Sequence, residues 1–388
     1  MEILKILFAV PHYSFNIQGA IRPLLKDLSK GLSERGHKAD VISLYIDEFW
    51  YPQWKKETFF DEGVKVTRLP SINPVPLRKG EKSNVLNFIN CGAIPSPGFR
   101  RIVKEYDILN FFDMIDLTFP FFSLFLKVPK IHCCITLTEQ FTFYMKHPLW
   151  RYVLSKTSDY YLTSTKHSLG LLHQLGIPED KSDYLYHGVN TELFKPSEIE
   201  RGKNTILFLS RIEPRKGLNI LVEAMSLVKN PSILLIAGQA ADDEYFKIVM
   251  KKAERENEKG FHKIEYIGIP SDEEKIKLFQ SVSLFVLPSI FEDYGIVNLE
   301  ALACETPVIS TKVGGVPEVV RDGENGYVVN PGNVKDLAYA IDKLLENEDL
   351  RRQMGKKGRE IVIKDFSWKK ILDRLEVIYH NLISKRRV

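Results

Sequence analysis

The stretch at residues 284–301 changes from an apolar run to a polar loop and then to a helical pattern. Leu284–Leu287 has the length of a buried strand, and Pro288 and Ser289 form a turn directly after it. A helical run begins near Asn298. A strand that leads through a short loop into a helix is the repeating unit of parallel α/β sheets, so this segment favours a doubly wound fold.

The same alternation recurs along both halves of the chain. In the first half, the strand Ile3–Val10, a loop at 11–20, a helix with leucines on one face and the strand Ala39–Leu44 form a βαβ unit. Further strands of this half are expected at residues 64–69, 108–112, 130–136, 160–164 and 182–185. Residues 47–98 are less regular, with a long irregular connection after the strand at 64–69. The second half is expected to contain strands at 204–210, 233–237, 263–267, 284–288, 307–311 and 326–329, and helices at 217–226, 272–281, 298–304 and 333–346. This order predicts parallel sheets with helices on both faces.

Length, charge and cysteine content limit the class of protein. A chain of 388 residues is long enough for two domains that each bury a core. The net charge of +4 is too small to indicate nucleic-acid binding. The four cysteines, at positions 91, 133, 134 and 304, have no CxxC spacing, so we expect neither a disulfide framework nor a zinc site.

The N-terminal residues are typical of a first strand and not of a signal peptide. The longest aromatic and apolar run, Leu117–Leu126, is about half as long as a bilayer span. These features predict a cytoplasmic protein, attached at most peripherally to the cytoplasmic membrane face. Two groups of aromatic and basic residues could make that contact: Trp50, Trp54, Lys55, Lys56, Phe59 and Phe60, and Lys146, His147, Trp150 and Arg151. The alternative is that their aromatic side chains belong to the core.

Two glutamates separated by seven residues, Glu292 and Glu300, enclose the pair Tyr294-Gly295. This pattern resembles the E-x7-E signature of retaining glycosyltransferases of family four. Three further segments resemble motifs of that family and follow one another in the family's order. They are His187–Asn190 with Phe194 and Pro196, Ser210–Gly217 with its Arg…Lys pair, and Gly314–Glu318, which has the pattern of the family's G-G-x-P-E turn. The resemblance is continuous from about Tyr186 to the C-terminus and rests mainly on residues 4–43 in the first half.

The resemblance implies the GT-B fold, an α/β architecture of two Rossmann-like doubly wound domains that face one another across a cleft. It implies an acceptor-side domain at residues 1–189 and a nucleotide-sugar-binding domain at 190–367. The C-terminal helix, at about 368–388, would cross back to the first domain. The implied activity is retaining, metal-independent transfer of a hexose from a nucleoside-diphosphate sugar to a hydroxyl of a sugar, a lipid-linked acceptor or a small molecule. We favour a UDP-sugar as donor, with a GDP-sugar next.

Three charged residues are the candidates for catalysis. Arg211 and Lys216 follow a strand, where fixed cations could stabilise the diphosphate as its charge grows during bond cleavage. A solvated basic loop is the alternative interpretation. The resemblance places Glu292 beside the transferred sugar, and the sequence does not identify it as a nucleophile.

The donor would be bound mainly by the loop and helix that follow Glu292. Glu300 would accept hydrogen bonds from the ribose hydroxyls, as the resemblance implies, and the backbone N–H groups of Gly295, Ile296 and Val297 are candidates for binding phosphate. Three further positions are candidates for donor binding: Gly19, Gly238 and Ile267. Gly19 has no side chain and would let the donor approach the backbone, Gly238 follows a strand, and Ile267 would lie near the base.

The first half departs from the family at the position where a histidine usually contacts the donor sugar. Thr138 stands there, followed by Glu139, and His132 is interpreted as a core residue of the preceding strand. Thr138, Glu139 and His12 are therefore the candidates for contacts with the acceptor or donor sugar. The chain contains no Asp-x-Asp pair, so we expect no metal and no other cofactor. It also lacks G-x-G-x-x-G, which disfavours a nicotinamide dehydrogenase.

Two other functions fit the same residues. A sugar-nucleotide epimerase or hydrolase on this fold could use Glu139 or His12 as an acid or base. A non-catalytic nucleotide-sugar-binding protein would explain Thr138. The expected partners are a nucleotide-sugar donor and a carbohydrate or lipid-linked acceptor, with no nucleic acid.

Overall fold

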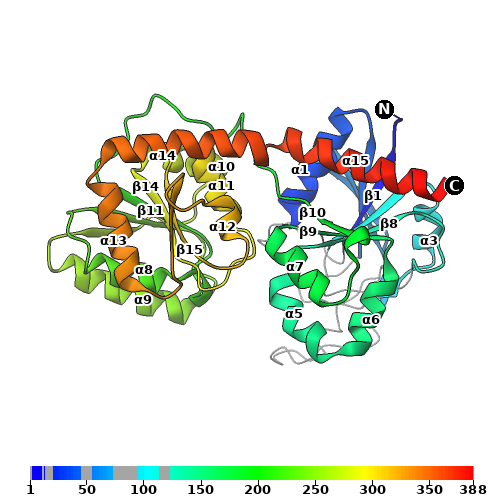
Figure 1. Ribbon diagram of the computed structural model, residues 1–388, viewed down its shortest axis with the longest axis horizontal. Coiled ribbons are helices and arrows are strands. Elements are labelled where there is room, and N and C mark those ends of the chain that lie inside the picture. The colour runs from blue at the N-terminus through cyan, green and yellow to red at the C-terminus, as the bar shows by residue number, and fades with distance from the viewer. Residues whose placement is uncertain are drawn as a thin grey trace. The chain divides into compact units, whose positions relative to one another are not determined.

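The computed structural model of the protein describes residues 2–10, 13, 21–44, 55–72, 94–112, 123–135 and 137–387. The chain forms two compact units (Figure 1). Unit 1 comprises Met1–Tyr186 together with Ile371–Val388, and unit 2 comprises His187–Lys370. Each unit is built around one large sheet, and we describe each by itself.

The sheet of unit 1 has the strand order β10-β9-β8-β7-β1-β2-β4-β3. Its neighbouring strands are parallel except for β3, which runs antiparallel to β4. The strands are β1 (Lys5–Val10), β2 (Lys38–Leu44), β3 (Glu57–Asp61), β4 (Val64–Leu69), β7 (Ile108–Phe112), β8 (Lys130–Cys134), β9 (Tyr160–Thr163) and β10 (Ser182–Tyr184). A separate antiparallel pair joins β5 (Ser71–Ile72) to β6 (Ile94–Pro95).

The helices of unit 1 cover this sheet with their leucine-bearing faces. In α1 (Ile21–Glu34), Leu24, Leu25, Leu28 and Leu32 are buried, as the period of the sequence predicts. The other helices of the unit are α3 (Gly98–Val103), α5 (Leu137–Lys146), α6 (Pro148–Thr157), α7 (Lys166–Gln174) and most of α15 (Trp368–Arg387), with a 3₁₀ turn η1 (Glu179–Lys181) before β10.

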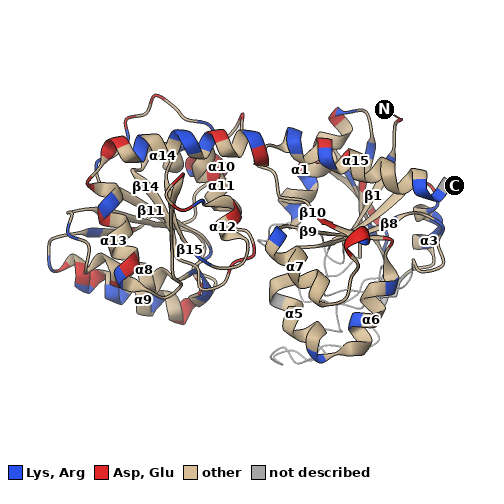
Figure 2. Cartoon of the chain, in the orientation of Figure 1, with Lys and Arg blue, Asp and Glu red and all other residues tan. Residues whose placement is uncertain are grey.

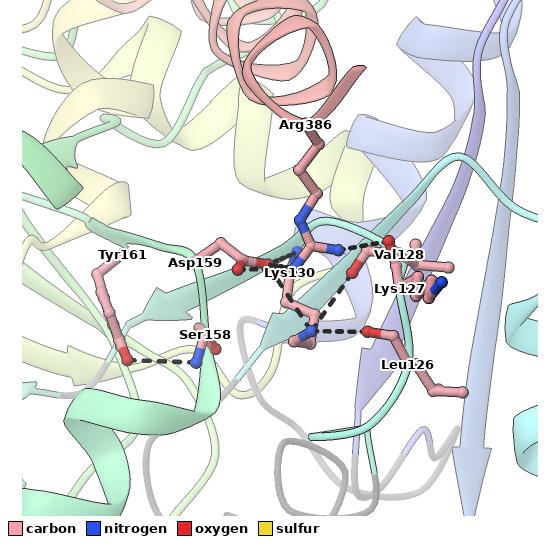
Figure 3. Close-up of polar contacts among 8 residues, drawn as sticks. All are labelled: Leu126, Lys127, Val128, Lys130, Ser158, Asp159, Tyr161 and Arg386. Carbon is pink, nitrogen blue, oxygen red and sulfur yellow. Dashed lines mark hydrogen bonds and ion pairs between the residues drawn. The ribbon is translucent and has the colours of Figure 1, made fainter. Parts of the chain in front are cut away.

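The C-terminal helix α15 belongs to unit 1 from Ile371 onward. Its buried Glu376 accepts a hydrogen bond from Arg35 at 2.8 Å and contacts His37 at 3.0 Å. The Tyr379 hydroxyl oxygen accepts a hydrogen bond from Asn110 at 2.8 Å. At the end of the helix, Arg386 binds both carboxylate oxygens of Asp159, which also lies 3.8 Å from the buried Lys130 ammonium (Figure 3). Polar contacts therefore fix this helix along its length.

The sheet of unit 2 is entirely parallel, in the order β13-β12-β11-β14-β15-β16. Its strands are β11 (Thr205–Leu209), β12 (Ile233–Ala237), β13 (Lys263–Tyr266), β14 (Leu284–Leu287), β15 (Val308–Thr311) and β16 (Gly326–Val329). Its helices are α8 (Leu218–Met225), α9 (Asp243–Asn257), α10 (Asp272–Ser281), α11 (Ile296–Ala303), α12 (Val316–Val319), α13 (Val334–Leu345) and α14 (Glu348–Ile361), with short turns η2 (Pro214–Lys216) and η3 (Val362–Phe366). The central strands carry no charged residues, whereas α9 and α14 carry many (Figure 2). All six strands end at one edge, which gathers the loops that follow them.

The predicted fold class of two doubly wound α/β units is confirmed. The sequence predicted the bounds of β4, β7, β12, β16 and α10 correctly. Other expectations were wrong in detail. The less regular stretch 47–98, where only a strand at 64–69 was expected, also contains β3, which pairs with β4, and the strand expected at 130–136 ends at Cys134. None of the helices in the described ranges combines the length and apolar character that a membrane span requires.

Candidate functional site

The candidate site lies in unit 2, where β11 and β14 end side by side. The loop after β11 passes through η2 to Gly217, whose φ of 72° is in the left-handed region. A Cβ atom at Gly217 would lie only 2.0 Å from the carbonyl oxygen of Pro288. The backbone N–H of Ile290 also donates to the Arg215 carbonyl oxygen at 2.8 Å. The absence of a side chain at Gly217 therefore lets the two loops pack against each other.

This packing brings Lys216 to Glu292. The ammonium of Lys216 donates a hydrogen bond to Oε2 of Glu292. The side chains are 11% and 14% exposed, so the ion pair is largely shielded from water. Sequence reasoning placed both residues near the diphosphate and the sugar, and the structure shows that they touch.

Arg211 lies in the same loop but is more open to solvent. Its guanidinium is 3.2 Å from the carboxylate of Glu213, which also accepts a hydrogen bond from Arg215 at 2.7 Å. Sequence reasoning missed Glu213 and its pairing with Arg215. The pattern Arg211-x-Glu213-x-Arg215 was the signal that could have identified this group, because a carboxylate between two cations attracts both of them.

The loop from Glu292 to Gly295 leads into α11, which begins two residues before the expected start. Gly295 precedes the helix with a φ of 73°. The backbone N–H groups of Ile296 and Val297 belong to the first turn of α11. N–H groups in the first turn of a helix have no acceptor within the helix. They are therefore placed to bind an anion at this end of the helix.

A second glycine turn supports the same loop from the end of β15. Gly314 has a φ of 48°, and a Cβ atom there would lie 2.0 Å from the Glu292 carbonyl oxygen. The backbone N–H of Gly315 donates to the Asp293 carbonyl oxygen at 2.9 Å. The G-G-x-P-E turn thus fixes the backbone that carries Glu292.

Glu300 lies one turn into α11 and is buried. Its Oε1 accepts a hydrogen bond from the ammonium of Lys275, in α10, at 2.9 Å. Sequence reasoning predicted both helices but missed Lys275, because nothing in a single sequence indicates which faces of two helices meet. The buried thiol of Cys304 follows α11, and burial raises its pKa to about 12.

Two further predicted positions lie at the ends of β12 and β13. Gly238 has a φ of 128°, and a Cβ atom there would lie 1.9 Å from the Ser210 carbonyl oxygen. The hydroxyl of Tyr266 donates to the Gly238 carbonyl oxygen at 3.0 Å. Ile267 follows Tyr266, and its side chain is exposed. These positions therefore border the same edge of the sheet as Lys216 and Glu292.

The remaining predicted residues belong to the first half of the chain. Gly19 and His12 lie outside the described residues. Thr138 and Glu139 are in the first turn of α5, and the side chain of Glu139 is not among the described ones. His132 is fully buried in β8, as expected of a core residue. Within the described ranges, no three His, Cys, Asp or Glu side chains are grouped closely enough to hold a metal ion.

The edge of the unit 2 sheet thus carries two cationic side chains, two buried or half-buried carboxylates and the N-terminal end of a helix. Cations and helix N-termini bind phosphate groups, and carboxylates accept hydrogen bonds from hydroxyl groups. Together they can bind a molecule that carries both phosphates and hydroxyls.

Two family models match the chain in succession. Residues 24–193 match Glycosyltransferase Family 4, and residues 189–361 match Glycosyl transferases group 1. An uncharacterised glycosyltransferase from Methanocaldococcus jannaschii is 32% identical over 53% of this chain and 55% of its own length. The chain spans about half the length of the curated relatives it matches.

Solved structures share the fold over almost the whole chain. Sucrose-phosphate synthase from Thermosynechococcus elongatus superposes with a TM-score of 0.79 at 20% identity, covering 98% of this chain and all of that one. Anabaena HepE in complex with UDP superposes with a TM-score of 0.76 at 18% identity, covering 97% of this chain and all of that one. Both likenesses show the GT-B fold. The chain belongs to the family 4, group 1 glycosyltransferases.

Proposed function

We propose that the protein transfers a hexosyl group from a nucleoside-diphosphate sugar to an acceptor hydroxyl, with retention at the anomeric carbon and without a metal ion. The contact between Lys216 and Glu292 at the N-terminal end of α11 carries this proposal. The proposal is supported because adjoining loops carry a cation, which can bind phosphate, and a carboxylate, which can accept hydrogen bonds from sugar hydroxyls. The family to which the chain belongs supports the proposal.

In the proposed reaction, the bond between the anomeric carbon and the β-phosphate oxygen breaks, and its electrons stay on the departing diphosphate. Lys216, Arg211 and the first N–H groups of α11 stabilise that growing negative charge. The oxygen of the acceptor hydroxyl bonds to the anomeric carbon from the same face. Its proton passes to the departing phosphate oxygen, which lies on that face and has become more basic.

The rest of the donor would contact the same edge of the sheet. Glu300 would accept hydrogen bonds from the ribose hydroxyls, and Gly295, Ile296 and Val297 would donate from their backbone to the diphosphate. Gly238 and Ile267 would border the base. We favour UDP as the nucleotide, which agrees with HepE having been crystallised with UDP.

A binding and product assay tests this function. Thermal unfolding would be followed with UDP-, GDP- and ADP-glucose, because a ligand that binds the folded state raises its apparent stability. One donor should raise the unfolding temperature of the wild-type chain and not of Lys216→Met. Mass spectrometry of reactions with sugar acceptors should then detect a glycosylated product. Release of free sugar regardless of acceptor would instead indicate a hydrolase, and binding of no donor would contradict the proposal.

We also propose peripheral contact with an anionic membrane through α5 and α6. Met145, Leu149 and Tyr152 are exposed there, beside the exposed Lys146 and Lys156. The chain from residue 140 to 158 contains no Asp or Glu, so this surface matches an anionic one. Trp150, assigned to the same patch from sequence, instead packs partly against the core of unit 1.

Sedimentation with vesicles tests the membrane contact. Vesicles containing phosphatidylglycerol should carry down the wild-type protein, and vesicles of phosphatidylcholine alone should not. The Leu149→Glu variant should lose this binding, because it replaces an exposed apolar side chain with a charge that anionic lipid repels. Equal binding of the protein to both kinds of vesicle would contradict the proposal.

A further inference from the structure

Helices α10 and α11 bring together two charged residues that are 25 positions apart in the sequence. The ammonium of Lys275 donates to Oε1 of Glu300 at 2.9 Å. The side chains are 21% and 10% exposed, so water screens the pair only weakly. Lys275 also lies 3.7 Å from Asp272, which is almost fully exposed and therefore contributes little.

An aromatic ring fixes the position of the lysine. The Lys275 ammonium lies 5.0 Å from the centroid of the Phe194 ring, within the range of a cation–π contact. Phe194 is itself buried, packs edge-on against Phe279 and donates its backbone N–H to Asn190 at 2.8 Å. The lysine is therefore held between a fixed ring and a carboxylate.

This arrangement restricts how the Glu300 carboxylate can turn. An ionised carboxylate has about four lone-pair sites on its two oxygens. A charge-assisted hydrogen bond from Lys275 to Oε1 fixes the plane of the group and thereby the direction of its remaining sites. Recognition of a pair of neighbouring hydroxyls depends on that direction, because each must meet a lone pair at hydrogen-bond distance.

We propose that Lys275 is a positioning residue that holds Glu300 toward the ribose hydroxyls of the donor and so makes the site selective for ribonucleotides over deoxyribonucleotides. The inference rests on the proposed function and names the residue that sets this selectivity. A site built to bond a hydroxyl rejects an analogue that lacks it, because the polar group of the protein is then left unpaired. If the carboxylate can turn away, that rejection weakens.

The test compares nucleotide pairs that differ only at the 2′ position. Calorimetry would measure the binding of UDP and 2′-deoxy-UDP, and of the corresponding GDP and ADP pairs, to four proteins. These are the wild type, Lys275→Met, Lys275→Arg and Lys277→Met, the last removing an exposed lysine from the same helix. The wild type should prefer its ribonucleotide by about tenfold or more, and Lys275→Met should reduce the preference to about twofold. Lys275→Arg should keep most of it, and Lys277→Met all of it.

Kinetics and stability separate positioning from a structural role. Lys275→Met should raise the KM for the donor and change kcat little, since the ribose lies away from the breaking bond. Thermal unfolding without ligand shows whether each variant is folded. A wild type without ribose preference, or a folded Lys275→Met that keeps it, would overturn the inference and leave the proposed function standing. A wild type that binds none of the nucleotides would overturn both.

Discussion

The ammonium of Lys216 contacts the carboxylate of Glu292, although the two residues lie 76 positions apart in the sequence. The contact joins the loop after β11 to the loop after β14, and both side chains are largely shielded from water. Removing one member of a half-buried ion pair is destabilising, because the charge of the other member is then uncompensated. The pair therefore fixes both loops in the positions that the proposed donor site requires.

We predict that Lys216→Met lowers kcat/KM for the donor by about a hundredfold or more, because it removes the cation that, in the proposed reaction, stabilises the departing diphosphate. Steady-state kinetics with the donor identified by thermal unfolding would measure the loss. Lys216→Arg should retain more activity than Lys216→Met, since it keeps the charge.

Arg215→Met is the matched control for this prediction. Arg215 is the neighbouring cation, and its side chain pairs with Glu213. Its backbone contact with Ile290 survives the substitution, so activity should stay within about threefold of the wild type. Equal losses in the two variants would show that the basic character of the loop, and not the contact with Glu292, matters.

Gly314 and Gly323 offer a test of the close packing behind Glu292. Both have positive φ, at 48° and 76°, but only Gly314 approaches another backbone atom, the carbonyl oxygen of Glu292. Gly323→Ala should cost about 1 kcal/mol, the strain of a left-handed alanine. Gly314→Ala should cost about 2–4 kcal/mol and also weaken donor binding, because the Glu292 backbone must move. Urea unfolding and calorimetry measure these effects, and similar costs for the two variants would contradict the prediction.

We expect transfer to proceed without a divalent cation, because in the proposed reaction Lys216 and Arg211 would supply positive charge where the diphosphate departs. Initial rates after treatment with EDTA and gel filtration should stay within about twofold of the untreated rate. A large loss that magnesium chloride restores would assign the charge stabilisation to a metal ion instead.

The C-terminal helix contains two acidic residues that bind the same arginine in different surroundings. Arg35 lies 2.8 Å from both Asp373 and Glu376, whose side chains are 51% and 3% exposed. Glu376→Ala should cost about 3 kcal/mol, because it leaves Arg35 and His37 without their buried partner. Asp373→Ala should cost less than about 1 kcal/mol, as is usual for an exposed pair. Urea unfolding of the two variants measures the difference, and equally small costs would show that the buried Glu376 adds no more to the stability than the exposed Asp373.

The sequence was most informative where one local pattern decides the structure. The strand β12, Ile233–Ala237, is a continuous apolar run that ends at a glycine, and its bounds followed from that alone. The strand β3, Glu57–Asp61, was missed because its two apolar residues are adjacent and so point to opposite faces, which leaves no apolar face, and because it pairs only along one edge. Whether such a segment forms a strand depends more on the neighbouring strand than on its own residues.

The helix α14 shows a different limit. Its sequence contains Gly355 and Gly358, which usually argue against a helix. In the structure, Cβ atoms at these positions would lie 2.1 Å from the Glu305 carbonyl oxygen and 2.6 Å from Leu302. The glycines therefore permit close packing next to α11. The contact of Lys275 with Glu300 was missed for a related reason, since it depends on how two helices pack.

His187 should make the protein less stable in acid. The imidazole is buried, and the absence of water around it lowers its pKa to about 4. The unfolded chain has the ordinary histidine pKa of about 6.5, so between pH 6.5 and 4 it binds a proton that the folded state does not. The free energy of unfolding should therefore fall as the pH falls through this window, by about 3 kcal/mol in total.

The His187→Phe variant isolates this contribution. Phenylalanine keeps a ring against Tyr294, whose hydroxyl donates to the backbone carbonyl of residue 187 and is not affected. Urea unfolding of both proteins at several values between pH 7.5 and 4.5, measured side by side, cancels the contributions of the other titrating groups. The stability of the wild type relative to the variant should fall steadily below about pH 6.5. A difference that stays constant across the range would mean that His187 takes up its proton as readily in the folded chain as in the unfolded one.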